Sequence, residues 1–451
     1  MENPTASSLT SDAKSRLLDK IRATQGSRSR AATGAVKQPN GAPEKATYQF
    51  SEFWEYKKLE IHREVAERAG IPNPFFLPQE GISENIVVVD GCELINFSSY
   101  NYLGLCGDQR VSQAAVDAIE RYGTSAGASR IVSGEKPVHR ALEAKIAKML
   151  GVEDAITMVS GHATNVTTIA TLFGPDDLII YDWLSHNSIL EGAKASGAKI
   201  MVVPHNDSKA LDAILTRTRR DYKRVLIVIE GIYSMDGDLA LVDEIIAIKR
   251  RHKALLMIDE AHSIGIVGEH GRGVVEHFGL TGSDIDIWMG TLSKSLAGCG
   301  GYIAGSHALV ELLKYTAPGF VYSVGMSPPV AAAALAALEI MQEETWRTKR
   351  LNRNAKMFRD LARERDLDVG LSDGLNIVPV IVEKSLVAGK LSEALFKRGI
   401  NVHPIIYPAV QEQAARLRFF VSSQHEEEQI RTTVDATAEE LERIQTLLDI
   451  E

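Results

Sequence analysis

Two charged side chains follow apolar runs in the middle of the chain, just past the point where each run ends. Asp259 is the last residue of the run Ala254–Asp259, and Lys294 comes shortly after the run Ile285–Gly290, among hydroxyl and glycine residues. A buried carboxylate needs a cation or a strong donor, and a lysine in such surroundings can form a Schiff base with a carbonyl cofactor. Taken singly, Asp259 is more typical of a turn cap and Lys294 of a solvated surface.

Two further polar clusters also follow apolar runs. Residues 160–164 read Ser-Gly-His-Ala-Thr at the expected start of a helix, where free backbone N–H groups favour a phosphate. Residues 185–188 read Ser-His-Asn-Ser and follow the run Leu178–Tyr181, which places His186 beyond a strand. Each cluster alone is a weak signal, because a lone histidine is more often structural than catalytic.

The four clusters together meet the needs of one cofactor, pyridoxal 5′-phosphate. It requires a lysine for its aldehyde, an acid for its pyridine nitrogen, a phosphate cradle and a group over its ring. The interval between Asp259 and Lys294 spans one helix and one strand. The two side chains are therefore expected at the same edge of a sheet.

Short apolar runs alternate with amphipathic patterns such as Leu241–His252. Such strands with helices between them predict an α/β fold with a mostly parallel sheet covered on both faces. Polar residues just past the strand ends then line the ligand crevice. The predicted strands are Ala155–Val159, Leu178–Tyr181, Lys199–Val203, Val225–Glu230, Ala254–Asp259, Ile285–Gly290 and Gly301–Ala304.

The pattern changes after about residue 330. An Ala-rich helix, Val330–Met341, continues into a long charged helical stretch, and a smaller α+β domain is expected to follow. Its predicted elements are Ile377–Val382, Leu391–Arg398, Arg416–Val421 and Glu426–Leu448. The predicted organisation is a tail (1–46), an N-terminal segment (47–95), a large cofactor-binding domain (96–329) and a small C-terminal domain (330–451).

Composition excludes several classes of protein. The 451 residues are 45% hydrophobic and 24% charged, and the formal net charge of −9 argues against a nucleic-acid binder. The three cysteines form no CxxC pair, so neither a disulfide framework nor a metal site is expected. The absence of a long apolar run or a secretory signal predicts a protein without a transmembrane segment, in the cytoplasm.

The chain resembles the α-oxoamine synthases, fold type I pyridoxal-phosphate transferases related to aspartate aminotransferase. The family includes serine palmitoyltransferase, 8-amino-7-oxononanoate synthase, 5-aminolevulinate synthase and glycine C-acetyltransferase. DEAHSxG followed by TxSKS at this interval is highly specific for the family, and SYNYLGL favours the serine palmitoyltransferase branch. The matching segments are SYNYLGL (99–105), GASRIVSG (127–134), SGHATN (160–165), LSHNSILEG (184–192), EGIYSMDGD (230–238), IDEAHSIGIVGEHGRG (258–273), GTLSKSLAGCGGYIAG (290–305) and ARLRF (415–419).

The resemblance implies four roles at the cofactor ring. Lys294 would hold the cofactor and act as general base, and Asp259 would pair with the pyridine nitrogen. His262 would hydrogen-bond the ring hydroxyl. His186 would stack on the ring and orient the substrate carboxylate.

Five further positions would surround the cofactor. Gly161 and His162 would offer backbone N–H groups to the phosphate, Thr291 and Ser293 would supply hydroxyls, and Ser234 would lie close by. Many relatives carry an aromatic residue where His162 stands. The segment YSVGMSPP (322–329) is one residue longer than the usual family pattern.

The substrate would meet two other residues. Arg418 matches the arginine that binds the substrate carboxylate, with Arg416 as its alternative, and Asn101 would contact the substrate. The implied reaction is a decarboxylative Claisen-type condensation of serine, glycine or alanine with an acyl thioester. It yields an α-amino ketone, CO₂ and a free thiol. An aminotransferase and a non-catalytic partner subunit are the alternatives, and the presence of Lys294 disfavours the second.

The resemblance further implies a homodimer with sites built from both chains. Residues 1–46 carry a formal charge of +4, against −13 for the remainder. An acidic acyl carrier protein could therefore be the thioester donor, with acyl-CoA as an equal alternative. The tail would then be a docking segment, and otherwise an inert linker or the remnant of a lost domain.

Overall fold

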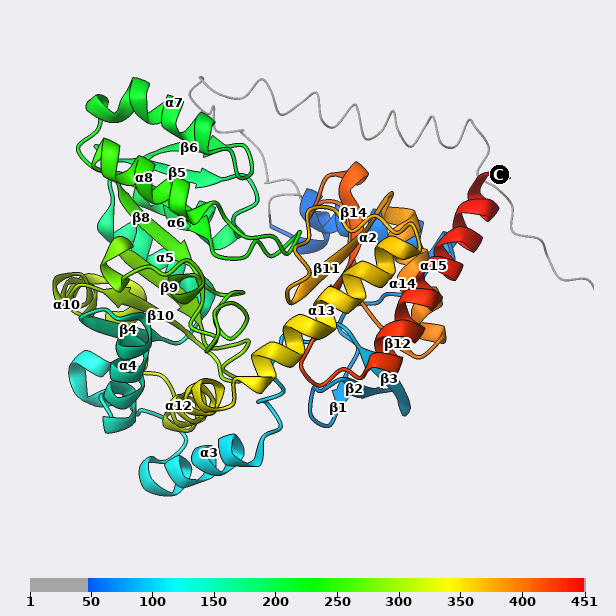
Figure 1. Cartoon of the computed structure of the whole chain (residues 1–451), viewed down its shortest axis with the longest axis horizontal. Helices are drawn as coiled ribbons and strands as arrows, with labels where there is room; N and C mark the ends of the chain where they lie inside the picture. The colour runs from blue at the N-terminus through cyan, green and yellow to red at the C-terminus, as the bar shows by residue number, and fades with distance from the viewer. Residues whose placement is uncertain (1–47, 450–451) are drawn as a thin grey trace, which may run out of the picture. The chain divides into compact units, whose positions relative to one another are not determined.

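The structure is a computed structural model that describes residues 48–449 (Figure 1). The predicted tail 1–46 lies outside the described residues. The chain divides into two compact units. One unit holds the residues up to Asn73 and those from Glu442 onward, and the other is Pro74–Leu441. All the site residues predicted above belong to the second unit.

A seven-stranded sheet forms the centre of the unit Pro74–Leu441. Its strand order is β4-β10-β9-β8-β7-β5-β6. The strands from β9 to β6 are parallel, and β10 runs antiparallel to both β4 and β9. The strands are β4 (Asp154–Met158), β5 (Leu178–Asp182), β6 (Lys199–Val203), β7 (Val225–Glu230), β8 (Leu255–Asp259), β9 (Ile287–Thr291) and β10 (Gly301–Gly305). The predicted strands and the mostly parallel sheet are confirmed.

Both faces of this sheet are buried except at its edge strand β6, as the continuous apolar runs predict. All six residues of β7 are buried, although successive side chains point to opposite faces. One face packs on α5 (Gly161–Leu172), α6 (Asn187–Ser196) and α10 (His307–Thr316), which contribute Ile169, Ile189 and Leu313 to a buried cluster. This packing presents the carboxyl ends of the parallel strands at one edge.

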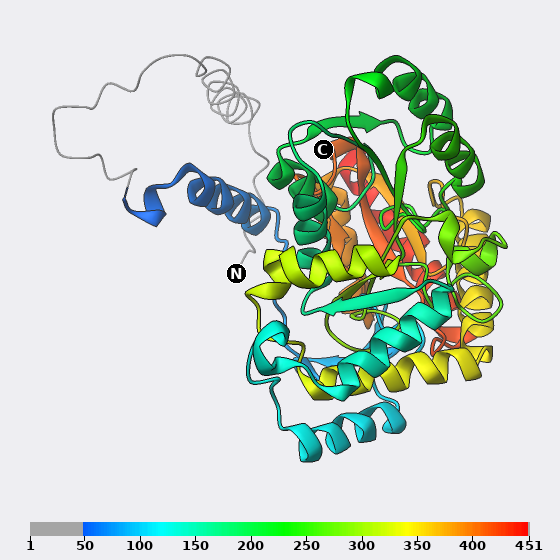
Figure 2. The same cartoon turned by 90° about the vertical axis from the view of Figure 1, so that its left-hand side faces the viewer.

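Five of the remaining helices match the helices that the sequence predicts, namely α8 (Val242–His252), α12 (Pro328–Glu343), α13 (Trp346–Glu364), α14 (Ser385–Lys397) and α15 (Glu427–Asp449). The predicted helix at 241–252 is α8. The Ala-rich stretch forms α12 and the charged stretch a separate helix, α13. Helices α3 (Gln109–Tyr122), α4 (Pro137–Leu150) and α12 lie side by side (Figure 2). The others are α2 (Trp54–Arg68), α7 (Ser208–Thr218), α9 (Val274–His277) and α11 (Pro318–Val321).

Two smaller sheets complete the same unit. One joins β1 (Gln79–Glu80), β2 (Ile86–Val89) and β3 (Cys92–Asn96) to β12 (Ile400–Asn401), which pairs with β3 in parallel. The other is the antiparallel sheet β11-β14-β13, from Ile377–Glu383, Ala415–Phe420 and Pro404–Ile405. Residues more than 300 apart in sequence thus meet at β3 and β12.

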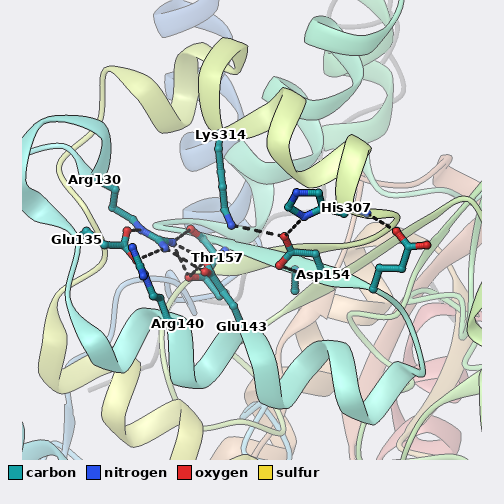
Figure 3. A network of polar contacts seen from close by, with 10 residues as sticks. Arg130, Glu135, Arg140, Glu143, Asp154, Thr157, His307 and Lys314 are labelled. Atoms are coloured by element: carbon teal, nitrogen blue, oxygen red, sulfur yellow. Dashed lines mark hydrogen bonds and ion pairs between the residues drawn. The ribbon is translucent and has the colours of Figure 1, made fainter.

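A buried ionic network holds the segment after α3 against β4. The guanidinium of Arg130 contacts Glu143 and lies 2.6 Å from Glu135 Oε2, and Glu143 also accepts the backbone N–H of Thr157 at 2.7 Å (Figure 3). Gly325 N donates to Ala128 O at 3.0 Å. The segments GASRIVSG and YSVGMSPP are therefore joined to each other and to the sheet.

Candidate active site

Two carboxylates lie side by side at the carboxyl edge of the large sheet. Glu230 ends β7 and Asp259 ends β8, and the two residues are direct register partners. Each is only 3% exposed. Asp259 Oδ1 accepts the N–H of Ala261 at 3.0 Å, as a turn cap would, and Oδ2 accepts from Asn165 Nδ2 at 2.8 Å. Asp259 therefore caps its turn and is also held by a second side chain.

Lys294 follows β9 and reaches the same edge. Its Nζ lies 2.6 Å from His262 Nε2 and 5.4 Å from the centre of the Tyr100 ring. Burial lowers the pKa of Lys294 to about 8, although the negative charges of Asp259 and Glu230 oppose the shift. Within residues 48–449, Lys294 forms no ion pair with a carboxylate. Its amine is therefore partly unprotonated near neutral pH, as a nucleophile or base requires.

His262 is a buried neutral imidazole. Burial lowers its pKa well below the usual value, and the positive charge of Lys294 adds to the effect. Tyr102 Oη lies 3.0 Å from Nδ1. Because an ammonium group can only donate, Nε2 of His262 accepts from Lys294 when the lysine is protonated, and Nδ1–H then donates to Tyr102. Tyr102 is thus a site residue that the sequence-based roles did not include.

Glu230 is a second residue that those roles did not include. Oε1 accepts the backbone N–H of His186 at 2.5 Å, and Oε2 accepts that of Ser234 at 3.2 Å. Burial raises the pKa of Glu230 to about 8, and the charge of Asp259 adds to the shift. Its position at the end of an apolar run is the same signal that singled out Asp259. The carboxyl group joins two segments that carry predicted cofactor contacts.

The predicted phosphate site lies at the N-terminus of α5. Ser160 caps the helix through a bond from Ala163 N, so the N–H groups of Gly161 and His162 lie in the first turn. A Cβ added at Gly161 would lie 2.9 Å from Thr291 Oγ1, so only glycine allows this approach. Thr291 Oγ1 donates to Gly300 O at 2.9 Å and lies 3.2 Å from Ser293 Oγ. Backbone donors and two hydroxyls therefore converge, as a phosphate requires.

His186 is joined to Asp259 through two side chains that the sequence analysis did not assign. Its Nδ1 lies 2.7 Å from Ser188 Oγ, and Asn165 contacts both Ser188 and Asp259. The ring of His162 stands edge-on to that of His186, with 6.2 Å between the centres. Asn165 and His162 come from α5, Ser188 from α6 with His186 as the N-cap of that helix, and Asp259 from β8. Asn165 stands one helical turn after Gly161, a spacing that alone does not indicate a role.

The two arginines of β14 differ in their partners. Arg416 forms an ion pair with Asp236, and the side chains of both are less than 10% exposed. Arg418 donates to Ser234 O at 2.8 Å and lies over the Phe420 ring at 4.7 Å. Its buried Nε has no hydrogen-bond partner in the described part of the chain. Arg418 is therefore the arginine of this pair that can still bind a carboxylate.

Asn101 is committed to the backbone around it. Its Nδ2 donates to Ser83 O at 3.0 Å and its Oδ1 accepts from Cys106 N at 3.1 Å. The residue is 8% exposed. The neighbouring Tyr100 instead lies over Lys294 and packs on Phe420, with 4.8 Å between the ring centres. The substrate contact expected of Asn101 stays a prediction, and Tyr100 is the residue of this segment next to the lysine.

The residues present fit pyridoxal phosphate. The amine of Lys294, with its lowered pKa, matches the aldehyde of that cofactor. The first turn of α5 and two nearby hydroxyls match its phosphate. The buried carboxylate of Asp259, held by the amide of Asn165, matches its ring nitrogen. A separate cavity of about 620 Å³ opens near Leu255 and Ile287, the first residues of β8 and β9, and is therefore remote from this edge. No helix within residues 48–449 has both the length and the hydropathy that crossing a membrane requires.

Sequence comparisons agree with this arrangement. The family described as "Aminotransferase class I and II" matches residues 93–436. The 8-amino-7-oxononanoate synthase of Geobacter sulfurreducens is 41% identical over 354 residues, which cover 78% of this chain and 90% of that protein. The enzyme of the same name from Symbiobacterium thermophilum is 40% identical over 351 residues, covering 78% and 89%.

Solved structures show the same similarity. Serine palmitoyltransferase from S. paucimobilis superposes with a TM-score of 0.83 at 28% identity, covering 87% of this chain and 98% of that one. The 8-amino-7-oxononanoate synthase from Francisella tularensis superposes with a TM-score of 0.67 at 27% identity, covering 78% and 99%. Every site residue described above lies within the residues that the family matches.

Proposed function

Because the chain belongs to the aminotransferase class I and II family and, within it, to the α-oxoamine synthases, we propose that it catalyses a decarboxylative condensation. A small amino acid (serine, glycine or alanine) reacts with an acyl thioester to give an α-amino ketone, CO₂ and a free thiol. The observation that carries this is Lys294, an amine with its pKa lowered to about 8 that lies between a neutral histidine and two buried carboxyl groups.

Pyridoxal phosphate, when bound, supplies an electron sink that stabilises negative charge on the amino-acid Cα. Lys294 would hold its aldehyde carbon and Asp259 its pyridine nitrogen, with His262 at the ring hydroxyl and His186 over the ring. The phosphate would be bound by Gly161, His162, Thr291 and Ser293, with Ser234 nearby. The free backbone N–H groups in the first turn of α5, and the close approach of Gly161 to Thr291, support this assignment.

The chain's own groups would handle the proton. Lys294, released once the amino acid occupies the site, takes the Cα proton as general base, and its lowered pKa suits that role. His262 competes poorly for this proton, because burial disfavours its protonated form and lowers its pKa well below the usual value. Arg418 would bind the substrate carboxylate before CO₂ is lost, which its unpartnered Nε supports.

A homodimer is the proposed assembly. The joined segments GASRIVSG and YSVGMSPP expose Val132 at 76% and Tyr322 at 85%, with Ile131 and Val324 at 46% and 53%. Exposed apolar side chains grouped on ordered segments are typical of an interface. We further propose that these segments meet the partner chain next to its active site.

The acyl donor, the domain division and the location are finer proposals. The basic tail 1–46 supports an acyl-carrier-protein donor, with acyl-CoA as the equal alternative. The seven-stranded sheet lies within 96–329 and the sheet β11-β14-β13 within 330–451, which supports a large and a small domain. Free, dispersed cysteines, namely Cys92, Cys106 and Cys299, support a cytoplasmic location.

The test is a product-balance assay on the full chain loaded with pyridoxal phosphate. Glycine, alanine and serine are each offered with acyl-CoA and with acyl carrier protein thioesters. We expect equal amounts of CO₂ and free thiol with at least one pair, and none with Lys294→Ala. Amino-group transfer to a 2-oxo acid without thiol release would instead identify an aminotransferase, and no turnover with any donor would favour the non-catalytic partner.

A further inference from the structure

A chain of three hydrogen bonds links His186 to Asp259. His186 Nδ1 lies 2.7 Å from Ser188 Oγ, Ser188 Oγ lies 2.9 Å from Asn165 Nδ2, and Asn165 Nδ2 lies 2.8 Å from Asp259 Oδ2. Ser188 is fully buried, and Asn165 is only 1% exposed. The chain crosses from α6 through α5 to β8, so each bond depends on the packing of different elements.

The chemistry of the four groups fixes which atom donates and which accepts in each of these hydrogen bonds. A carboxylate offers only acceptors, so Asn165 must point its NH₂ group at Asp259, and the same group donates its second hydrogen to Ser188 Oγ. The hydroxyl of Ser188 must then donate its own hydrogen elsewhere. Within residues 48–449 its other hydrogen-bond partner is Nδ1 of His186.

A second donor reaches the same nitrogen of His186. The backbone N–H of Ser188 points at Nδ1 from 3.3 Å. Two donors facing Nδ1 leave no place for a ring hydrogen there, so a neutral His186 carries its hydrogen on Nε2. Burial lowers the pKa of His186, Asp259 opposes this shift, and Lys294, His162 and Arg418 add to it. The ring is therefore neutral at ordinary pH.

We propose that Asn165 and Ser188 are positioning residues that hold His186 as its Nε2–H tautomer and, through the same amide, hold the carboxylate of Asp259 in place. An Nε2–H group can donate to a substrate carboxylate, whereas the other tautomer would present a bare acceptor to it. One buried amide thus orients both the ring-stacking histidine and the acid of the pyridine nitrogen. The roles of His186 toward the substrate and of Asp259 toward the cofactor rest on the proposed function.

The first test reads the tautomer directly by ¹⁵N NMR of histidine-labelled full-length protein, with and without pyridoxal phosphate. The resonance of His186 is assigned from its loss in His186→Gln. We expect the neutral Nε2–H form in the wild type, and a raised pKa of His186 in Ser188→Ala, which loses the hydroxyl donor to Nδ1 but keeps the backbone N–H donor. Ser185→Ala is the matched control, because the buried hydroxyl of Ser185 in the same loop has no partner in the described structure.

The second test separates positioning from folding. Ser188→Ala should raise the amino-acid KM about three- to tenfold, the range for one lost hydrogen bond, with the KM for the thioester unchanged. Asn165→Leu keeps the side-chain volume and should weaken pyridoxal-phosphate binding about tenfold or more, measured by absorbance titration. Thr168→Val, which removes an unpartnered buried hydroxyl from the same helix, is its control.

The outcomes distinguish this inference from the function on which it rests. An Nδ1–H tautomer in the wild type, or an unchanged pKa of His186 in Ser188→Ala, would overturn the inference even in an active enzyme. An inactive wild type with the Nε2–H tautomer would remove the function and leave the arrangement of Asn165 and Ser188 intact. If Asn165→Leu does not fold, the ¹⁵N NMR spectrum of Ser188→Ala still tests whether Ser188 positions His186.

Discussion

Burial and charge act on Lys294 in opposite directions. Burial lowers its pKa to about 8 from an ordinary 10.5, while Asp259 and Glu230 favour the ammonium form. The reactive amine should therefore appear about two pH units earlier than that of an ordinary lysine. We expect reductive labelling by a small aldehyde to reach half its maximum at Lys294 near pH 8, measured by peptide mass spectrometry across pH 6–11. Labelling that rises only near pH 10 would contradict the structure.

Arg416 and Arg418 allow a matched comparison within one strand. Arg416→Met would leave Asp236 buried without its cation, so a loss of roughly 3–5 kcal/mol of stability is expected. Arg418→Met leaves no buried carboxylate behind and should instead raise the amino-acid KM about 10- to 100-fold. Thermal unfolding and steady-state kinetics on both variants check this. The assignment fails if Arg418→Met destabilises the fold and leaves KM unchanged.

At the scale of elements, the loop between β7 and α8 is held from both sides. Glu230 accepts the N–H of Ser234 at its start. Near its end, Asp238 Oδ2 lies 2.8 Å from His205 Nε2, and His205 Nδ1 lies 3.0 Å from Asp182 at the end of β5. The loop that carries Ser234 is therefore positioned by strands β5 and β7 in addition to its own backbone hydrogen bonds, such as Tyr233 N to Asp238 O at 2.9 Å.

The His205 contacts predict a pH dependence of stability. Burial alone would lower the pKa of His205, but hydrogen bonds to Asp182 and Asp238 raise it to about 10. Because the unfolded chain releases this proton near pH 6.5, the stabilisation is full below that value and is lost as pH rises through about 10. Urea unfolding at pH 6, 8 and 10 should show this decline in the wild type.

Substitution isolates the contribution of that histidine. His205→Gln should cost roughly 3 kcal/mol at pH 6 and remove the decline attributed to this group. His270→Gln is the control, since its contact with Glu276 is exposed and worth about 1 kcal/mol at most. Equal losses for the two variants would show that the Asp182–His205–Asp238 contacts do not stabilise the loop.

At the scale of the whole molecule, the exposed apolar side chains on the joined segments predict self-association. Tyr322→Glu should shift the protein from dimer to monomer at micromolar concentration in sedimentation, because it places a charge in an interface. Leu371→Glu, at a residue 60% exposed on another part of the chain, should leave the dimer intact. A wild type that is monomeric and active at nanomolar concentration would rule out the shared-site assembly.

The charge difference between the tail and the rest of the chain predicts a salt-sensitive encounter. Deleting residues 1–46 should leave turnover with acyl-CoA unchanged, since every proposed site residue lies beyond Ser99. If an acidic carrier protein uses the tail, the deletion should raise its KM several-fold, and 0.5 M salt should do the same to the wild type. Unchanged kinetics with both donors at low and high salt would leave the tail without a docking role.

The sequence by itself determined the large sheet and its functional edge. Six of the seven strands of that sheet read as apolar runs because both of their faces are buried, and the edge strand β6 is apolar although of its residues only Val203 is buried. The polar residues Asp259 and Lys294 mark where two of those runs end. Local patterns suffice here because strand periodicity and strand ends are properties of neighbouring residues. The motifs around Asp259 and Lys294 were sufficiently specific to indicate the family and its cofactor.

Only the tertiary structure decided which hydrogen-bond and ion-pair partner each side chain of the site has. Arg416 and Arg418 are both polar positions in one strand, and the ion pair with Asp236, 180 residues away in sequence, separates them. Asn101 was expected to contact the substrate, and its side chain is hydrogen-bonded to the backbone of Ser83 and Cys106. The sequence around Glu230, Asn165 and Ser188 does not indicate which groups these side chains hydrogen-bond. Hydrogen bonds between different elements depend on how those elements pack, and no periodicity along the chain encodes that geometry.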